Sequence, residues 1–173
     1  MHKSISNINL IKEELKLISP KIPSIIAVSK TFSVNDILPL VNHGHIHFGE
    51  NKVQEAMDKW PNIKKEFNKI KLHLIGKLQT NKVKFVLPLF DYIHSLDNEK
   101  LAQKISNEQK KYQEKPKIFI QVNTGNEIQK SGINQKDLSD FYHFCKNLDL
   151  DIIGLMCIPP NDSKSNEYFK EMC

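Results

Sequence analysis

The sequence contains no arginine, and all 25 of its basic residues are lysines. These lysines are scattered among 20 acidic residues, so the formal net charge is only +5. Proteins that bind nucleic acids usually gather basic residues on one surface and use arginine for paired contacts with phosphate or guanine. We therefore expect no nucleic-acid partner. No apolar run approaches the ~20 residues that cross a bilayer, so we expect no membrane partner either.

Cysteine is also scarce. Cys145, Cys157 and Cys173 are odd in number and lack the spacing of a metal site. They are typical of reduced thiols, which persist in the cytosol. The pattern over residues 1–17 is amphipathic and indicates an outer helix, with no secretion signal. We expect a cytoplasmic protein.

Glycine is scarce too, with six residues in the chain. A phosphate group usually binds in a cradle of backbone N–H groups, which is often glycine-rich and lies at the start of a helix. None of the six glycines belongs to such a loop. The sequence therefore contains no recognisable phosphate cradle.

Residues 25–31 have the sequence Ile-Ile-Ala-Val-Ser-Lys-Thr. A short apolar run of this kind, preceded by Pro23 and followed by polar residues, predicts a buried strand that ends at Lys30. Ligands of α/β proteins bind beyond the carboxyl ends of the strands. There a lysine amine can form a Schiff base with an aldehyde. The alternative is that Lys30 is a solvated strand end, like most other lysines of the chain.

Strands and helices alternate along the predicted chain. The predicted strands span residues 25–30, 45–49, 71–76, 91–96, 117–123 and 151–157. The predicted helices span residues 1–17, 33–44 with Ser33 and Asp36 at the start, 50–60 before Pro61, 63–68, 81–87, 98–113 capped by Asp97, 135–147, and a last helix from near Ser163. No low-complexity linker divides the chain, so we expect a single domain over residues 1–173.

Alternation of this kind implies a parallel sheet with right-handed crossovers. An open doubly wound sheet places its site at one switch point, whereas a (β/α)₈ TIM barrel gathers site residues from most strand ends. Polar residues mark many of the predicted strand ends: Lys30, Glu50, Asn51, Ser95, Gln121 and Asn123. This favours the barrel. A barrel needs eight strands and about 250 residues, so we expect an incomplete one, with about six of eight strands present and the C-terminal part missing.

Seven short motifs follow one another along residues 25–160. They are Ala27–Lys30, Phe48–Asn51 with Val53–Glu55, His73–Lys82, His94–Asp97, Gln121–Asn123, Lys130–Gly132 and Gly154–Met156. In this order they resemble the YggS/PROSC family of pyridoxal phosphate homeostasis proteins. The third motif is the most specific. The fold of that family is similar to the barrel of the alanine racemase N-terminal domain.

The resemblance implies a cofactor site for pyridoxal 5'-phosphate. It implies a Schiff base between the cofactor and Lys30, and a hydrogen bond from Asn51 to the ring hydroxyl. It also implies that His73 lies beneath the cofactor and Met156 beside its ring. The residue pattern leaves a structural alternative for three of them: Asn51 can cap a helix, His73 can be a satisfied core histidine, and Met156 can fill the core.

For other polar residues the sequence leaves more than one role open. Ser95 and Asn123 either line the mouth of the barrel or satisfy loop backbone. His43, His45 and His47 have no cysteine or carboxylate at ligand spacing, and we interpret them as structural. We therefore expect no metal site.

The resemblance implies a carrier or regulator of pyridoxal phosphate without established substrate turnover. We expect a monomer that passes the cofactor to apo-enzymes, and we assign no catalytic residue, because no tyrosine or cysteine is positioned opposite Lys30 as a racemase requires. The alternatives are a pyridoxal phosphate-dependent amino-acid racemase and an open-sheet binding module without pyridoxal. The family's phosphate cradle would lie beyond Cys173, so we expect this chain to bind the cofactor poorly and to be unstable alone.

Overall fold

The computed structural model describes residues 2–125, 127, 130–162 and 165–172. Six parallel strands form one sheet in the order β1-β2-β3-β4-β5-β6. The strands are β1 (Ala27–Val28), β2 (His47–Glu50), β3 (Lys71–Leu74), β4 (Tyr92–Leu96), β5 (Lys117–Val122) and β6 (Asp151–Cys157). The alternation of strands and helices predicted from the sequence is confirmed.

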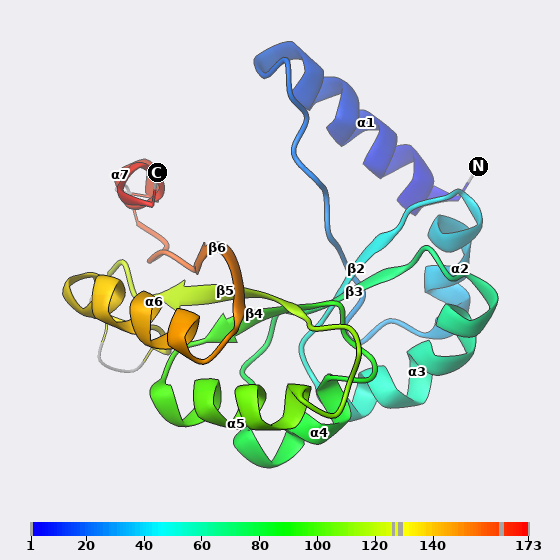
Figure 1. Cartoon of the computed structure of the whole chain (residues 1–173). Helices are drawn as coiled ribbons and strands as arrows, with labels where there is room; N and C mark the ends of the chain where they lie inside the picture. The colour runs from blue at the N-terminus through cyan, green and yellow to red at the C-terminus, as the bar shows by residue number, and fades with distance from the viewer. Residues whose placement is uncertain (1, 126, 128–129, 163–164, 173) are drawn as a thin grey trace.

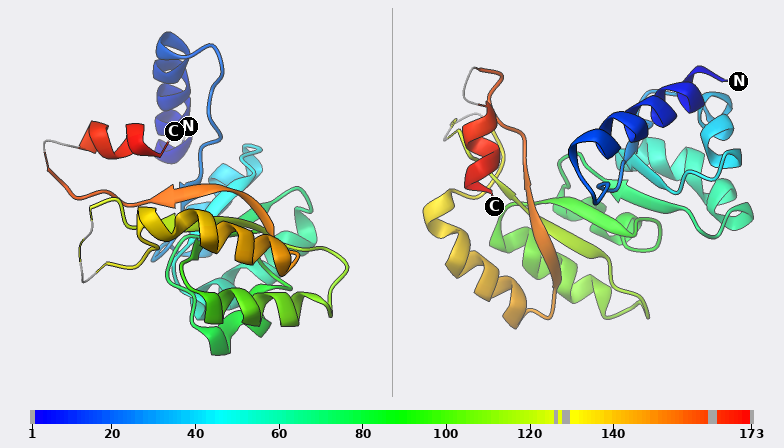
Figure 2. Two further views of the ribbon diagram at one scale, coloured as in Figure 1. Left: turned by 60° about the vertical axis from the view of Figure 1, so that its left-hand side comes forward. Right: turned by 90° about the horizontal axis from the view of Figure 1, so that it is seen from above.

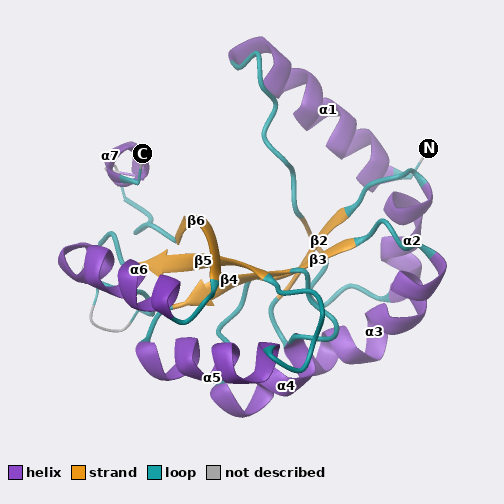
Figure 3. Cartoon of the chain, viewed as in Figure 1, coloured by secondary structure: helices purple, strands orange, loops and turns teal. Residues whose placement is uncertain are grey.

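Helices connect the strands on one side of the sheet. The helices are α1 (Lys3–Ile18), α2 (Val34–Asn42), α3 (Val53–Glu66), α4 (Val83–Val86), α5 (Glu99–Gln109), α6 (Leu138–Asn147) and α7 (Ser165–Glu171), with 3-10 turns at Thr80–Lys82 and Gln135–Asp137. Figure 1 shows α2 to α6 in an arc around the outer side of the curved sheet, with α1 and α7 on the other side. Figure 3 shows the same arc by element type.

The strand order identifies the architecture. A doubly wound sheet reverses its strand order at a switch point and carries helices on both faces. Here neighbours in sequence are neighbours in the sheet throughout. The two views of Figure 2 show that the strands curve in an arc. The expected α/β fold, an incomplete barrel with six strands, is confirmed.

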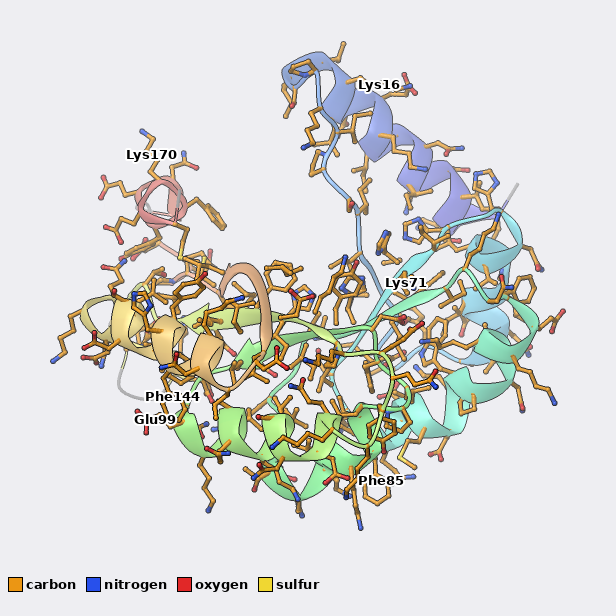
Figure 4. The ribbon with its side chains drawn as sticks, viewed as in Figure 1. Lys16, Lys71, Phe85, Glu99, Phe144 and Lys170 are labelled. Carbon is orange, nitrogen blue, oxygen red and sulfur yellow. The ribbon has the colours of Figure 1, made fainter. Side chains whose placement is uncertain are left out.

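The hydrophobic core lies between the sheet and the arc of helices. Alternate strand residues such as Phe48, Leu72 and Ile93 face the helices and are almost fully buried. Figure 4 shows the labelled Phe85 on the helical side and the labelled Lys71 among the strands. The strand residues that alternate with Phe48, Leu72 and Ile93 point to the opposite face, which is the inside of the arc.

Helix α3 differs from its prediction. Pro61 was expected to stop this helix, yet α3 continues through Pro61 to Glu66. The residues Val53, Ala56, Trp60 and Ile63 form one buried stripe along the whole helix. The packing of this stripe outweighs the loss of one backbone hydrogen bond at the proline.

The capping residue of α5 also differs. Asp97 was expected to cap this helix, but the cap is Asn98, whose Oδ1 accepts the backbone N–H of Leu101 at 2.9 Å. The start of α2 agrees with its prediction, because Asp36 accepts the backbone N–H of Ser33 at 3.0 Å. The last helix was expected from near Ser163, which lies outside the described residues.

The first strand is shorter than predicted. It covers Ala27 and Val28, although Ser29 still donates its backbone N–H to the Gly49 carbonyl at 2.9 Å. The chain then turns at Thr31, whose φ is 67°. Lys30 consequently lies in the turn that follows β1.

Strands β1 and β6 are the two edges of the sheet. Their apolar residues Val28 and Ile153 are 46% and 43% exposed. Among the described residues, no helix is long and apolar enough to span a lipid bilayer.

Candidate functional site

A cavity of about 600 Å³ lies beyond the carboxyl ends of the strands. Its volume is within the range of about 300–1,000 Å³ that is typical of small-molecule sites. Residues at or after the ends of β1, β2, β3, β5 and β6 contribute to it, because parallel strands end at the same edge of a sheet. The lining residues are Val28, Lys30, Asn51, Ile75, Gly76, Lys77, His94, Gln121, Val122, Asn123, Lys130, Ser131, Met156 and Ile158.

Lys30, Asn51 and Met156, three of the four residues predicted as ligands, line this one cavity. The side chain of Lys30 is exposed, and we find no hydrogen bond to its amine within the described part of the chain. Met156 is half-buried and lies opposite Gln121 in the β5–β6 register.

The cavity is electropositive. Lys30, Lys77 and Lys130 line it, and no aspartate or glutamate is among its described lining residues. Lys130 forms an ion pair with Glu127, which lies outside that lining. The arrangement favours an anionic ligand that carries a group able to react with an amine.

A buried carboxylate holds the backbone on both sides of the cavity. Oε1 of Glu50 accepts hydrogen bonds from Ser29 Oγ at 2.8 Å and Trp60 Nε1 at 3.0 Å, and it pairs with Lys59 Nζ at 2.7 Å. The side chain of Glu50 is fully buried, and that of Lys59 is 10% exposed. Because Ser29 precedes Lys30 and Glu50 precedes Asn51, this cluster fixes the positions of both ligand candidates.

Helix α3 also fixes the turn that contains Lys30. Lys59 donates to the carbonyls of Ser29 at 2.9 Å and Phe32 at 3.2 Å. The carboxylate of Glu55 accepts the backbone N–H of Thr31 at 2.5 Å. The hydrogen bond from Lys59 lowers the pKa of Glu55, which keeps this acceptor ionised.

Asn51 does not cap a helix. Helix α3 begins at Val53 with Lys52 as its cap residue, so the structural alternative for Asn51 does not apply. Gly76 packs closely against the backbone of Asn51: a Cβ atom at Gly76 would lie 2.3 Å from the Asn51 carbonyl oxygen. The glycine therefore allows the ends of β2 and β3 to approach each other at the cavity.

His73 is not among the residues that line the cavity. It is 4% exposed, stacks on Tyr92 with ring centroids 4.1 Å apart, and donates to or accepts from His94 Nε2 through its Nδ1 at 2.8 Å. His94 is the histidine that lines the cavity. Burial lowers the pKa of His73 to about 3 and that of His94 to about 4.

His94 was not predicted as a site residue from the sequence. Alternation along β4 places Tyr92 and His94 on the same face, as it places Lys71 and His73 on one face of β3. This signal was available for His94 as much as for His73. The register of the two strands determines which histidine reaches the cavity. Because His73 pairs with Tyr92, His94 lies two residues nearer the carboxyl edge of the sheet.

Ser95 and Asn123 were expected either to line the mouth of the barrel or to satisfy loop backbone, and the structure distinguishes the two residues. Ser95 is 2% exposed and does not line the cavity. Asn123 lines it, and its side chain also donates to the Glu127 carbonyl at 2.9 Å and accepts the Glu127 N–H at 3.2 Å. Asn123 therefore both contributes to the cavity and satisfies loop backbone.

The described cysteines do not line this cavity, and neither do His43, His45 and His47. Cys145 and Cys157 are free thiols, and burial raises the pKa of Cys145 to about 12. Cys173 lies outside the described residues. The ring Nε2 of His45 bonds to the His47 carbonyl at 2.8 Å. In the described ranges we find no group of three or more histidine, cysteine, aspartate or glutamate residues that could hold a metal ion.

Comparison with known families gives one match over almost the whole chain. The model of the alanine racemase N-terminal domain matches residues 5–172. The pyridoxal phosphate homeostasis protein of Vibrio alginolyticus is 38% identical over 157 residues, which cover 88% of this chain and 67% of that protein. The protein of the same name from Vibrio cholerae is 39% identical over 140 residues, covering 79% and 59%. The chain thus spans about three-fifths to two-thirds of these relatives.

Solved structures show the same fold. PipY of Synechococcus elongatus, in a structure with pyridoxal phosphate bound, has a TM-score of 0.74 and 33% identity, covering 91% of this chain and 74% of that one. Without the cofactor PipY has a TM-score of 0.80 and 32% identity, covering 94% and 78%. Alanine racemase of Clostridium difficile has a TM-score of 0.70 at 15% identity, covering 96% and 44%, and that likeness concerns the fold alone.

Proposed function

The chain belongs to the alanine racemase N-terminal domain family and, within it, to the pyridoxal phosphate homeostasis proteins, and on this premise we propose that it binds pyridoxal 5'-phosphate for intracellular cofactor homeostasis. The observation that carries the proposal is the exposed Lys30 at an electropositive cavity that Asn51 and Met156 also line. We propose that residues 1–173 act as a single cofactor-binding barrel domain.

The donor set fits the cofactor. Pyridoxal phosphate supplies an aldehyde, and Lys30 supplies the amine with which it forms a Schiff base. The amide of Asn51 suits the ring hydroxyl, and the thioether of Met156 suits contact with the ring. Lys77 and Lys130 provide positive charge for the phosphate. His73 supports the site from beneath, through its hydrogen bond with His94.

We propose a carrier with no substrate turnover. A racemase-like enzyme is the alternative, and it needs a second acid–base group opposite Lys30. The described lining of the cavity contains neither tyrosine nor cysteine, which favours the carrier. The exposure of Lys30 suits reversible loading and transfer to apo-enzymes. The free thiols of Cys145 and Cys157 suit a reducing compartment, so we propose a cytoplasmic location. The monomer stays a prediction from the sequence.

Borohydride trapping tests the role of Lys30. The chain is incubated with pyridoxal phosphate, reduced and mapped by peptide mass spectrometry, together with the variant Lys30→Met and the control Lys52→Met, which changes an exposed lysine outside the cavity lining. We expect the label to concentrate on Lys30 in the unmodified chain and in Lys52→Met, and this concentrated label to be lost in Lys30→Met. A label spread over many lysines, without enrichment at Lys30, contradicts the proposal.

The same preparation distinguishes a carrier from a racemase. The loaded chain is incubated with single amino acids in deuterated water, and exchange at the α-carbon is followed by NMR. We expect no exchange above that of free pyridoxal phosphate. Exchange that depends on Lys30 supports the racemase instead.

A further inference from the structure

Three histidine rings form a continuous hydrogen-bonded chain across the inner face of the sheet. Nδ1 of His47 lies 2.9 Å from Nε2 of His73, and Nδ1 of His73 lies 2.8 Å from Nε2 of His94. His47 is on β2, His73 on β3 and His94 on β4. We call these three residues the histidine chain.

The strand register produces this arrangement. His73 pairs with Gly49 on β2 and with Tyr92 on β4. His47 lies two residues before Gly49, and His94 lies two residues after Tyr92, so both are diagonal neighbours of His73 on its own face. The histidine chain therefore advances toward the carboxyl edge of the sheet at each step.

The histidine chain connects two separate cavities. His94 lines the proposed cofactor cavity. His47 lines a second cavity of about 360 Å³, which is also bounded by Ile8 of α1, by Ile22 and by His43. His73, between them, is almost completely buried. Each cavity thus meets one end of the same row of imidazoles.

Aromatic rings hold the imidazole planes. Tyr92 stacks on His73 with an interplanar angle of 7°, and Phe119 stacks on His94 with ring centroids 4.4 Å apart. Rotation of either imidazole would break this stacking as well as a hydrogen bond. The rings of His73 and His94 are therefore fixed in the orientation that keeps the histidine chain hydrogen-bonded.

Neutral imidazoles in such a chain must share one tautomer. Burial lowers the pKa of all three histidines, and each neutral ring has one donor and one acceptor. If His73 donates from Nδ1, His94 accepts at Nε2 and His47 donates from Nδ1, so all three carry the Nδ1 proton. If His73 donates from Nε2, all three carry the Nε2 proton.

We propose that the histidine chain is a proton relay between the second cavity and the proposed cofactor cavity. The inference deepens the proposed function and rests on it for the identity of the ligand. In one transfer, His94 gives its Nδ1 proton to an acceptor in the cofactor cavity and receives a proton at Nε2 from His73 Nδ1. His73 receives a proton at Nε2 from His47 Nδ1, and His47 takes one at Nε2 from a hydronium ion in the second cavity, which is left as water, so the acceptor gains the one proton that the solvent loses.

This sequence moves one proton without placing a full charge on the buried His73. It also converts all three rings from the Nδ1 to the Nε2 tautomer. Because the stacked rings cannot turn over, the relay resets only by carrying a proton back. It therefore suits a reversible step, such as the making and breaking of a Schiff base at Lys30 when a cofactor is loaded and released.

Charged groups lie near both ends of the relay, because Lys30, Lys77 and Lys130 line the cavity that His94 also lines. Lys71 and Asp91 act on His47 with opposite sign, and Asp91 also acts weakly on His73. His45 bonds to the backbone of His47. At the His94 end the described lining carries lysines and no carboxylate, whereas Lys71 and Asp91 act on His47 with opposite sign at the other end.

Nitrogen NMR of the whole chain with ¹⁵N-labelled histidine tests the relay. In the unmodified chain at neutral pH, we expect His47, His73 and His94 to show the same tautomer ratio. In His47→Phe we expect the ratio at His94 to shift, although the two residues are on different strands. The matched control His43→Phe changes an exposed residue of the same cavity and should leave His94 unchanged. Different tautomers at the three positions of the unmodified chain overturn the proposal.

A kinetic measurement gives the functional readout. In His73→Phe, which keeps a ring against Tyr92, we expect trapping of pyridoxal phosphate at Lys30 and its release to slow together by up to about 10², with an unchanged Kd. Unchanged rates, or a change in only one of the two rates and therefore in Kd, indicate a structural role for His73 and overturn the relay. If the chain does not bind pyridoxal phosphate at all, the proposed function fails, while the shared tautomer remains measurable by itself.

Discussion

Ser29 and Glu50 are joined by a hydrogen bond of 2.8 Å between Ser29 Oγ and Glu50 Oε1, across the ends of β1 and β2. Each of the two residues immediately precedes a residue that lines the proposed cofactor cavity, Lys30 or Asn51. The carboxylate faces the helices, whereas the residues it positions line the cavity. Its other oxygen, Oε2, has no hydrogen-bond partner among the described residues, and Lys59 is the cation that pairs with this buried carboxylate.

Removing Lys59 should therefore destabilise the chain strongly. Lys59→Met keeps most of the side-chain volume but leaves the fully buried Glu50 without its cation, and loss of one partner of a buried pair typically costs about 3–5 kcal/mol. Urea unfolding measures the change. Lys52→Met, an exposed lysine beside the same helix, should change the free energy of unfolding by less than about 0.5 kcal/mol. A similar, small effect of both variants contradicts the role of Lys59.

A side chain at position 76 should disturb the cavity. In Gly76→Ala the new Cβ would lie 2.3 Å from the Asn51 carbonyl oxygen, and backbone must move to relieve the contact. We expect a loss of about 1–3 kcal/mol in stability and changed amide NMR shifts at Asn51. Gly154→Ala is the control, because its Cβ would meet the ring of Phe119 at 3.1 Å, and a side chain can adjust. Equal effects at the two positions would rule out the close approach.

Acid should weaken the fold before the carboxylates titrate. The pKa of His73 is about 3 and that of His94 about 4 in the folded chain, against an ordinary value of 6.5. Below about pH 6.5 the unfolded chain takes up protons that the folded chain does not, so stability falls as pH falls toward these lower values. Each histidine contributes a slope of about 1.4 kcal/mol per pH unit in this window.

Unfolding midpoints between pH 6.5 and pH 4.5 measure this dependence. His94→Phe should reduce the slope by the contribution of one histidine, about 1.4 kcal/mol per pH unit. His143→Gln removes an exposed histidine of α6 and should leave the slope unchanged. An unaltered slope in His94→Phe would mean that this histidine is protonated in the folded chain.

The start of α5 offers a comparison of two adjacent residues. Asn98→Ala removes the side chain that accepts the Leu101 N–H, and loss of such a cap costs about 0.5–2 kcal/mol. Asp97→Ala removes the neighbour that accepts from the Asn98 amide at 2.6 Å and should cost less. Thermal unfolding of the two variants gives the order, and a larger cost for Asp97→Ala contradicts the observed cap.

Much of the fold was predictable because the decisive patterns are local. Alternation of apolar runs with amphipathic stretches identifies strands and helices, and a parallel sheet brings all carboxyl ends to one edge. Lys30, Asn51 and Met156 could therefore be assigned to one cavity from their places at or just after strand ends. Pro61 shows where a local rule fails, since the buried stripe of α3 extends beyond it.

The tertiary structure alone decided which side chains meet. Whether His73 or His94 reaches the cavity depends on the register of β3 against β4, and register comes from pairing between segments distant in sequence. The partners of Glu50 depend in the same way on how α3 packs across β2. Sequence by itself determined the order of the elements and the chemistry at their ends, because these follow from neighbouring residues. The contacts between elements required the packed sheet, because they depend on every crossover at once.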